Sequence, residues 1–331
     1  MRIAQDDGMR RAIGEADVIL ATSMLNLPAA RGMYPALIKP TVVYFHENQF
    51  AYPIGSSGRH GDKRSDSSSI AATVDLHFAY SQFQTATIAD AVVFNSQHNR
   101  QTFLSGCETF LRRMPDTRYP STVSMIAAKS HIVPPGFEPC FTSPATAIVD
   151  RDRDTIAIGW VGRLESDRRF DRLIAVVDRL ATHSTKFELI LLGPRPNRMP
   201  QTWSAMLDRH ADRVRIDGFV KSEPVYRNYL ASMDIVISTT DHEFFGIAMC
   251  EAIHAGAIPV VPDGLAYDDY VPDRLRIRRD DDFVRNMCDR ILELRDSHRR
   301  TQLRSRCQAS ISTLTRRSMV DRLDALLESV V

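Results

Sequence analysis

The stretch DIVISTTDHEFFGIAMCEAIHAGAIPVV, residues 234–261, decides the fold class. It holds an apolar run, a short polar loop, a helical segment that is apolar on nearly every side, and a second apolar run. Continuous apolar runs indicate strands buried on both faces, as in a parallel sheet covered by helices. The stretch therefore predicts a strand–helix–strand unit whose polar loop lies at the carboxyl end of the first strand, where open α/β sheets bind ligands.

Strand-like runs, separated by helical patterns, extend along the chain on both sides of this unit. They cover residues 17–22, 41–46, 91–95 and 131–134 in the first part, and 156–161, 187–192, 213–218, 234–239, 258–261 and 275–278 in the second. We therefore predict an α/β protein with two Rossmann-like domains. The first domain spans residues 1–142, a charged linker spans 143–154, and the second domain spans 155–331, with a last helix that can cross back.

The composition limits the classes of partner. The chain has 331 residues, is 44% hydrophobic and carries a net charge of +1, so its overall charge indicates neither a nucleic acid nor a membrane. Its five cysteines show no metal-ligand spacing, and no uncharged apolar run approaches the roughly 18 residues of a membrane span. We expect a soluble cytoplasmic protein with reduced thiols, no metal and no membrane partner.

Two glutamates surround the start of the helix in the opening stretch. Glu243 precedes the helix, as acids commonly do, whereas Glu251 lies inside it among apolar neighbours. A carboxylate buried without partners costs several kcal/mol, so Glu251 pairs with an arginine or binds a ligand. Eight residues of helix span about 12 Å, which prevents the two carboxylates from sharing a proton.

This separation suits an elongated ligand with hydroxyl groups at both ends. Free N–H groups at the start of the helix, near Phe245, Gly246 and Ile247, would face an anion between the two carboxylates. A sugar nucleotide has this layout, with hexose hydroxyls, a diphosphate and a ribose diol.

A second element lies at the end of the first strand of the second domain. In GWVGRLESDRR, residues 159–169, Gly162 occupies the expected turn and is followed by Arg163 and Arg168. Two guanidinium groups beside a glycine turn can clamp a diphosphate and stabilise it as a leaving group. Alternatively, both arginines are ordinary surface residues of an arginine-rich protein.

Glu243 and Glu251 form the E-x7-E signature of retaining family 4 glycosyltransferases, which have the GT-B fold of two domains with a cleft between them. Five segments resemble, within that group, the tRNA-queuosine α-mannosyltransferase family: YFHENQFAYP (44–53), YSQF (80–83), ADAVVFNS (89–96), ISTTDHEFFGIAMCEA (237–252) and PVVPDGLAYDDYVP (259–272). The resemblance implies transfer of mannose from GDP-mannose to queuosine in a tRNA anticodon. It further implies retention of the anomeric configuration, with no metal and no cofactor other than the donor substrate.

The resemblance also implies a role for each candidate residue. Glu243 would bind hydroxyls of the donor hexose, and Glu251 would bind the ribose diol. Arg163 and Arg168 would bind the diphosphate, although the family usually has lysine at the position of Arg168, and the two side chains differ in reach. His46 would lie near the sugar and the acceptor, so His46 and Glu243 are the catalytic candidates.

The acceptor side has weaker signals. His46 ends the apolar run 41–46 and is followed by Glu47 and Asn48, but a lone histidine is more often a structural residue. Tyr80 and Gln82 are either acceptor-binding or plain helix residues. The segment FLRRMPDTRYP, residues 110–120, places Arg112, Arg113 and Arg118 near an aromatic residue, which suits contact with RNA or a solvated helix end.

The first residues, MRIAQDDGMRRAIGEADVILAT, place a polar segment before the first strand candidate. By the resemblance, a strand and a Gly-rich loop precede this point, so we expect the first domain to be incomplete. Two other functions stay open on the sequence. One is a family 4 enzyme with a different donor or a non-RNA acceptor, and the other is a sugar-nucleotide-binding protein that is inactive because of its short N-terminus.

Overall fold

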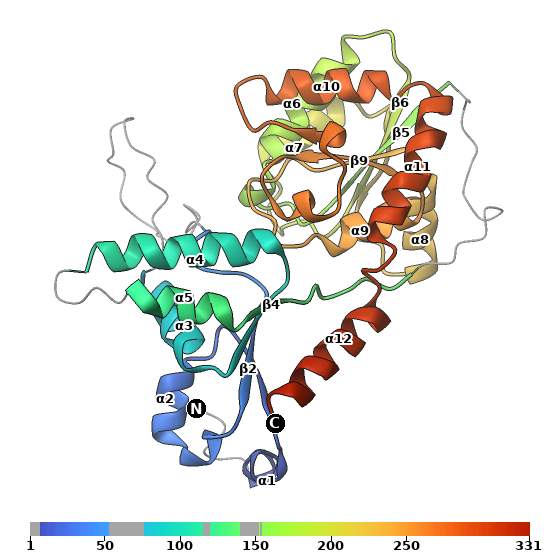
Figure 1. Cartoon of the computed structure of the whole chain (residues 1–331). Helices are drawn as coiled ribbons and strands as arrows, with labels where there is room; N and C mark the ends of the chain where they lie inside the picture. The colour runs from blue at the N-terminus through green and yellow to red at the C-terminus, as the bar shows by residue number, and fades with distance from the viewer. Residues whose placement is uncertain (1–6, 53–75, 115–119, 140–151, 153) are drawn as a thin grey trace. The chain divides into compact units, whose positions relative to one another are not determined.

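The computed structural model describes residues 7–52, 76–114, 120–139, 152 and 154–331. Contacts divide the chain into two compact units (Figure 1). The first unit is Met1–Pro135 together with Arg317–Val331, and the second is Gly136–Arg316. Each unit has its own parallel sheet and its own apolar core.

The first unit is built on four parallel strands in the order β1-β2-β3-β4. They are β1 (Ile19–Thr22), β2 (Thr41–Phe45), β3 (Ala91–Phe94) and β4 (Ser130–Ile132). The helices are α1 (Asp7–Glu15), α2 (Leu27–Met33), α3 (Leu76–Ile88), α4 (Gln97–Arg112), α5 (Pro120–Ala128) and α12 (Arg316–Ser329), with a 3-10 turn at Pro35–Leu37.

Different helices cover the two faces of this sheet. Val43 and Phe45 of β2 pack against the face that carries α3, α4 and α5, for example on Phe103. Val42, which points the other way, packs on the face covered by α12, where Met319 lies (Figure 1). The alternation along one strand shows why β2 is apolar at every position, because both of its faces are buried.

The second unit has six parallel strands in the order β10-β9-β8-β5-β6-β7. They are β5 (Ile156–Val161), β6 (Phe187–Leu192), β7 (Val214–Gly218), β8 (Ile235–Ile237), β9 (Ile258–Pro262) and β10 (Arg276–Ile277). The helices are α6 (Phe170–Ala181), α7 (Gln201–Arg209), α8 (Glu223–Ser232), α9 (Ile247–His254), α10 (Phe283–Glu293) and α11 (Ser297–Ile311). This strand order is that of the Rossmann fold, in which the direction of strand addition reverses between β5 and β8, and ligands bind at that switch point.

The prediction of two Rossmann-like α/β units with parallel sheets is confirmed, and every predicted strand run contains a strand. The units end elsewhere than expected, since the first stops at Pro135 rather than at residue 142. Phe137 explains this boundary, because its N–H donates to Leu314 O at 3.0 Å and its carbonyl accepts from Arg316 N at 2.8 Å, which ties it to the second unit. Of the predicted linker, only residues 152 and 154 are among those described.

Candidate active site

Two loops meet at the switch point of the second sheet. One follows β5 and covers residues 162–169, and the other follows β8 and covers residues 238–246. The hydroxyl of Thr239 donates to Arg168 O at 2.9 Å, and that of Thr240 donates to Asp167 O at 3.0 Å. The N–H of Asp241 also donates to Asp167 O at 3.0 Å, so the two loops are joined side by side.

Arg168 and Glu243, one from each loop, form an ion pair. Arg168 Nη1 donates to Glu243 Oε2 at 2.6 Å, and both side chains are largely buried. Burial alone would lower the pKa of Arg168, but Glu243 beside it raises that pKa above its usual range, so the guanidinium stays charged. The sequence predicted that these two residues bind different parts of one ligand. In the structure they form an ion pair with each other.

The start of α9 is held in a conformation that requires glycine. Gly246 has φ of +89°, and a Cβ there would lie 2.9 Å from Tyr270 Oη. The Tyr270 hydroxyl donates to Phe245 O at 2.7 Å, and Phe245 N donates to Glu243 Oε1 at 3.4 Å. One of the N–H groups that we expected to face an anion, that of Phe245, is therefore directed at Glu243, while Ile247 begins α9.

Glu251 lies inside α9, as expected, and is held by a tyrosine. The hydroxyl of Tyr226 donates to Glu251 Oε2 at 3.0 Å. Burial raises the pKa of Glu251, partly offset by this hydrogen bond and by the charge of Arg227. In the described part of the chain, no arginine or lysine forms an ion pair with Glu251, so its carboxylate keeps a desolvation cost that a ligand could relieve.

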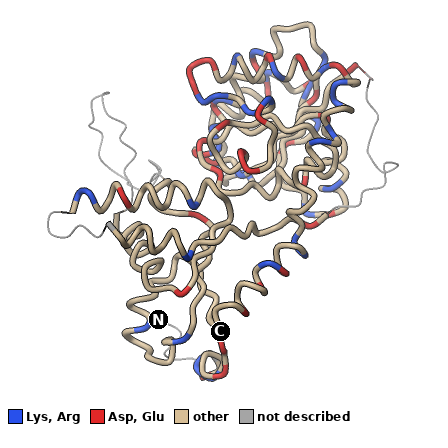
Figure 2. The backbone as a smooth tube through the Cα atoms, viewed as in Figure 1, with Lys and Arg blue, Asp and Glu red and all other residues tan. Residues whose placement is uncertain are grey.

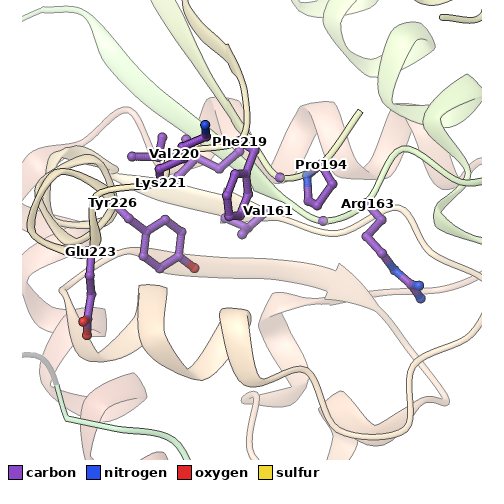
Figure 3. A pocket seen from close by; sticks show the side chains of 11 residues that line it. Val161, Arg163, Pro194, Phe219, Val220, Lys221, Glu223 and Tyr226 are labelled. Carbon is purple, nitrogen blue, oxygen red and sulfur yellow. The ribbon is translucent and has the colours of Figure 1, made fainter. Parts of the chain in front are cut away.

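A pocket of about 360 Å³ opens at the carboxyl ends of β5, β6 and β7 (Figure 3). Phe219 forms part of its apolar wall and is 66% exposed, which is high for a phenylalanine. Figure 3 shows Arg163 at one end of the pocket and Tyr226 at the other. The lining residues are Val161, Gly162, Arg163, Leu192, Gly193, Pro194, Phe219, Val220, Lys221, Glu223 and Tyr226.

Two lining residues connect this pocket to the predicted site. Tyr226 contacts both the pocket and Glu251, so the carboxylate lies directly behind the wall. Arg163 pairs only loosely with Glu165, at 3.4 Å between exposed side chains, a contact weak enough to yield to a phosphate. The sequence reading missed Phe219, Lys221 and Tyr226; the segment after the strand at 213–218 was the available signal.

The first unit has a separate pocket, of about 320 Å³, at the carboxyl end of its sheet. His46, directly after β2, lines it together with Thr22 of β1 and residues of α12. The ring of His46 packs 4.6 Å from that of Tyr44, and this partial burial lowers the pKa of His46, with Glu47 opposing the shift. His46 is therefore neutral near pH 7 and offers a ring nitrogen as hydrogen-bond acceptor.

Two predicted acceptor residues, Asn48 and Gln82, are buried at the loop after β2. Asn48 is fully buried, and its amide donates to Asn99 Oδ1 at 2.8 Å and to Thr102 Oγ1 at 2.9 Å. Gln82 is also buried, and its Oε1 accepts from Gln49 N at 2.9 Å. Both side chains therefore use their polar atoms to hold the loop after β2.

Two further acceptor candidates, Tyr80 and Arg112, lie on α3 and α4. Tyr80 is 40% exposed, and its ring lies 5.7 Å from that of Phe110, two residues before Arg112. Arg112 and Arg113 are exposed, and the carboxyl end of α4 is basic in Figure 2. Glu108 pairs with Arg112 at 3.3 Å. Arg118 lies outside the described residues.

Within the described residues, no group of three or more histidine, cysteine or acidic side chains could hold a metal ion. The helices that the structure describes include none that is long and apolar enough to cross a membrane.

Two α/β units, each with a parallel sheet, the second in the Rossmann strand order and with a pocket at the carboxyl ends of β5, β6 and β7, have the architecture of the GT-B fold of glycosyltransferases. Similar solved structures share this fold. The chain aligns with Anabaena HepE in complex with UDP at a TM-score of 0.73 and 18% identity, covering 99% of this chain and 82% of that one. Sucrose-phosphate synthase from Thermosynechococcus elongatus aligns at a TM-score of 0.67 and 16% identity, covering 95% and 73%.

In its first unit the chain matches the tRNA-queuosine alpha-mannosyltransferase family. Residues 4–137 match the N-terminal domain of that family, and residues 155–296 match the glycosyl transferases group 1 domain. The chain is 30% identical over 264 residues to tRNA-queuosine alpha-mannosyltransferase of Drosophila melanogaster, which is 77% of this chain and 66% of that protein. It therefore spans just under two thirds of that relative's length.

A shorter match involves a lipid-modifying enzyme. The chain is 31% identical over 102 residues to a GDP-mannose-dependent alpha-(1-6)-phosphatidylinositol dimannoside mannosyltransferase of Mycobacterium tuberculosis, covering 30% of this chain and 25% of that one.

Proposed function

We propose that this chain transfers mannose from GDP-mannose to queuosine in a tRNA anticodon, in the cytoplasm, with retention of the anomeric configuration and without a metal. The observation that carries the proposal is the family match of the first unit combined with 30% identity to the fly enzyme. The geometry of the second unit supports the donor part of the proposal, and the surface of the first unit supports the acceptor part.

The donor fits the second unit as follows. The guanine base enters the apolar pocket beside Phe219, and the ribose diol binds Glu251 behind Tyr226. The diphosphate lies against Arg163 and the Arg168–Glu243 pair, where guanidinium charge stabilises the leaving group as its bond to mannose breaks. Glu243 Oε1, which among the described residues accepts only long hydrogen bonds from the backbone N–H groups of Phe244 and Phe245, also accepts from the hexose hydroxyls. The arginines supply the positive charge that a divalent cation supplies in other transferases.

The acceptor fits the first unit. His46 is neutral, so one of its ring nitrogens accepts a hydrogen bond from the attacking hydroxyl or the other donates one to a phosphate. The exposed ring of Tyr80 and the basic end of α4 suit an unstacked base and its phosphates.

Mass spectrometry of tRNA nucleosides tests this proposal. Cells with the gene should contain mannosyl-queuosine, and cells without it should contain only queuosine. Purified protein should transfer mannose from GDP-mannose to queuosine-containing tRNA and not to the same tRNA with guanosine at that position. An unchanged queuosine profile in both strains would contradict the tRNA acceptor.

A lipid acceptor is the second candidate, because of the match to the phosphatidylinositol dimannoside mannosyltransferase. The same purified protein, offered GDP-mannose with phosphatidylinositol mannosides in place of tRNA, distinguishes the two acceptors. Thermal protection by GDP-mannose but not by UDP-glucose separately tests the donor.

A further inference from the structure

Three neighbouring strands of the second unit end in glycine at the edge that forms the pocket. Gly162 follows β5, Gly193 follows β6, and Gly218 ends β7. Gly162 N donates to Leu192 O and Gly193 N donates to Gly218 O, both at 2.9 Å. A Cβ on Gly193 would lie 2.1 Å from Gly162 O, so the strand ends approach more closely than any side chain at Gly193 permits.

One buried arginine, Arg195, donates hydrogen bonds to groups at all three strand ends. Arg195 Nη1 donates to Gly193 O at 3.1 Å and to Gly162 O at 3.5 Å, and Nη2 donates to Leu191 O at 3.1 Å. Nη2 and Nε also donate to Asp217 Oδ1, at 2.6 Å and 2.9 Å. All five N–H groups of the guanidinium are thus used, on groups from all three strands or the turns after them.

Two tryptophans enclose this guanidinium. Its Cζ lies 5.7 Å from the ring of Trp160 and 5.2 Å from that of Trp203, and the Arg195 side chain is only 12% exposed. A charge this far from water is tolerated only with a full set of partners, which fixes its position firmly. A group fixed in this way can set the spacing of the backbone around it.

The surrounding backbone forms the pocket wall. Gly162, Gly193 and Phe219, the residue after Gly218, all line the pocket. The carbonyl of Gly162 also belongs to the peptide that leads into Arg163, the exposed arginine at the pocket end. We propose that Arg195 is a positioning residue for the nucleotide pocket: it fixes the three strand ends and so sets nucleotide affinity and base selectivity. The identity of the nucleotide rests on the function proposed above.

Arg195→Lys tests this role while keeping the charge that Asp217 needs. A lysine has three donors on a flexible stem and cannot replace the planar five-donor fork. We expect the dissociation constant for GDP, measured by isothermal calorimetry on the full chain, to rise by at least about tenfold, the equivalent of one good polar contact. The ratio of GDP to UDP affinity should fall as well, because a wall with looser spacing selects less between bases.

Arg215→Lys is the matched control. Arg215 Nη1 pairs with Glu188 Oε1 at 3.0 Å, with side-chain exposures of 18% and 17%, between the same strands β7 and β6 but in their amino-terminal halves. The Arg215→Lys substitution should lower the melting temperature about as much as Arg195→Lys does, and it should leave GDP affinity within about twofold of wild type.

Equal loss of GDP affinity in both variants would reduce Arg195 to a general stabilising role, and so would an unchanged affinity in Arg195→Lys. If the wild-type chain prefers UDP, the donor assignment is wrong, but the same comparison made with UDP still tests Arg195. If it binds neither nucleotide, both proposals fail together with the pocket assignment.

Discussion

Arg163 and Arg168 lie only five residues apart, yet they have different surroundings. Arg163 is 57% exposed and loosely paired, whereas Arg168 is locked to Glu243 and its Nε is buried without a hydrogen-bond partner among the described residues. The sequence could place both beside the glycine turn, but it could not show this difference. The pairing depends on a contact across 75 positions of the chain, which local spacing does not contain.

Arg163→Ala and Arg168→Ala should therefore have different effects. Arg163→Ala should weaken GDP binding by roughly tenfold without lowering the melting temperature, since the only ion pair it removes in the described residues, with Glu165, is exposed and weak. Arg168→Ala should lower both turnover and the free energy of unfolding, because it leaves Glu243 largely buried without its partner.

Calorimetry with GDP and a thermal melt of each variant separate these effects. Arg278→Ala, at an arginine that is 84% exposed and outside the pocket, serves as the control and should change neither quantity. A clear loss of stability in Arg163→Ala would contradict its assignment as a free ligand-binding group.

Glu251→Gln should stabilise the free protein and weaken the nucleotide complex. Burial raises the folded-state pKa of Glu251 above its ordinary value of 4.5. Between these two pKa values the folded chain holds more protons than the unfolded chain, so the free energy of unfolding falls as pH rises through that window. Glutamine removes this dependence and still accepts from Tyr226.

The expected gain at neutral pH is below about 1 kcal/mol, or roughly 2–4 °C in Tm. GDP affinity should fall, since a ribose diol donates more strongly to a carboxylate than to an amide. Melting curves from pH 4 to pH 8 with and without GDP measure both effects, and Glu293→Gln, at a surface acid of α10, is the control. A Glu251→Gln variant with unchanged GDP affinity would remove the ribose role.

Helix α9 depends on the backbone of the residue before it. Gly246→Ala would force a side chain into φ of +89° and against Tyr270 Oη and Tyr267 Cε1, at 2.9 and 3.1 Å. We expect a loss of about 1–3 kcal/mol in the free energy of unfolding, because both tyrosines are buried and hydrogen-bonded. Urea denaturation measures this loss.

Gly32→Ala provides the comparison. Gly32 lies in α2, and a Cβ there meets nothing within 4 Å. Alanine should raise stability at this helical position by up to about 1 kcal/mol. Equal effects of the two substitutions would show that the turn before α9 is not held as described.

At the scale of elements, most strands and helices of the fold could be predicted from the sequence. The central strands, such as β2, β5 and β8, were visible as apolar runs because both of their faces are covered, and the loop with Glu243 was placed correctly between β8 and α9. The pocket wall was not visible, because Phe219 and Tyr226 follow a strand without any polar pattern to single them out. The burial of Asn48 and Gln82 was also hidden, since polar side chains that hold a loop look the same in sequence as those that bind a ligand.

At the scale of the whole molecule, each unit has its own apolar core, so a core substitution in one unit should destabilise that unit alone. Met319 of α12 is 3% exposed and packs on the β2 face of the first sheet. Met319→Ala should lower the stability of the first unit by about 2–5 kcal/mol. GDP affinity should stay at the wild-type value, because the residues proposed to bind GDP all belong to the second unit.

Hydrogen exchange of the amides of β2 and β3 reports on the first unit, and GDP binding reports on the second. The control is Asp324→Ala, at an exposed position of α12, which should leave both measurements unchanged. A parallel loss of GDP binding in Met319→Ala would show that the units do not respond independently.

The place of α12 in the chain also has a consequence for synthesis on the ribosome. The residues of β1 to β4 are translated first, but the helix that covers one face of their sheet follows the entire second unit, Gly136–Arg316. At about 5–20 residues per second, that face stays without its cover for roughly ten seconds or more while the second unit emerges and can fold. During this interval Val42, Tyr44 and Val93 form an apolar surface that a holding chaperone would recognise. The nascent first unit should therefore depend on chaperones more than the second, although it is the first to leave the ribosome.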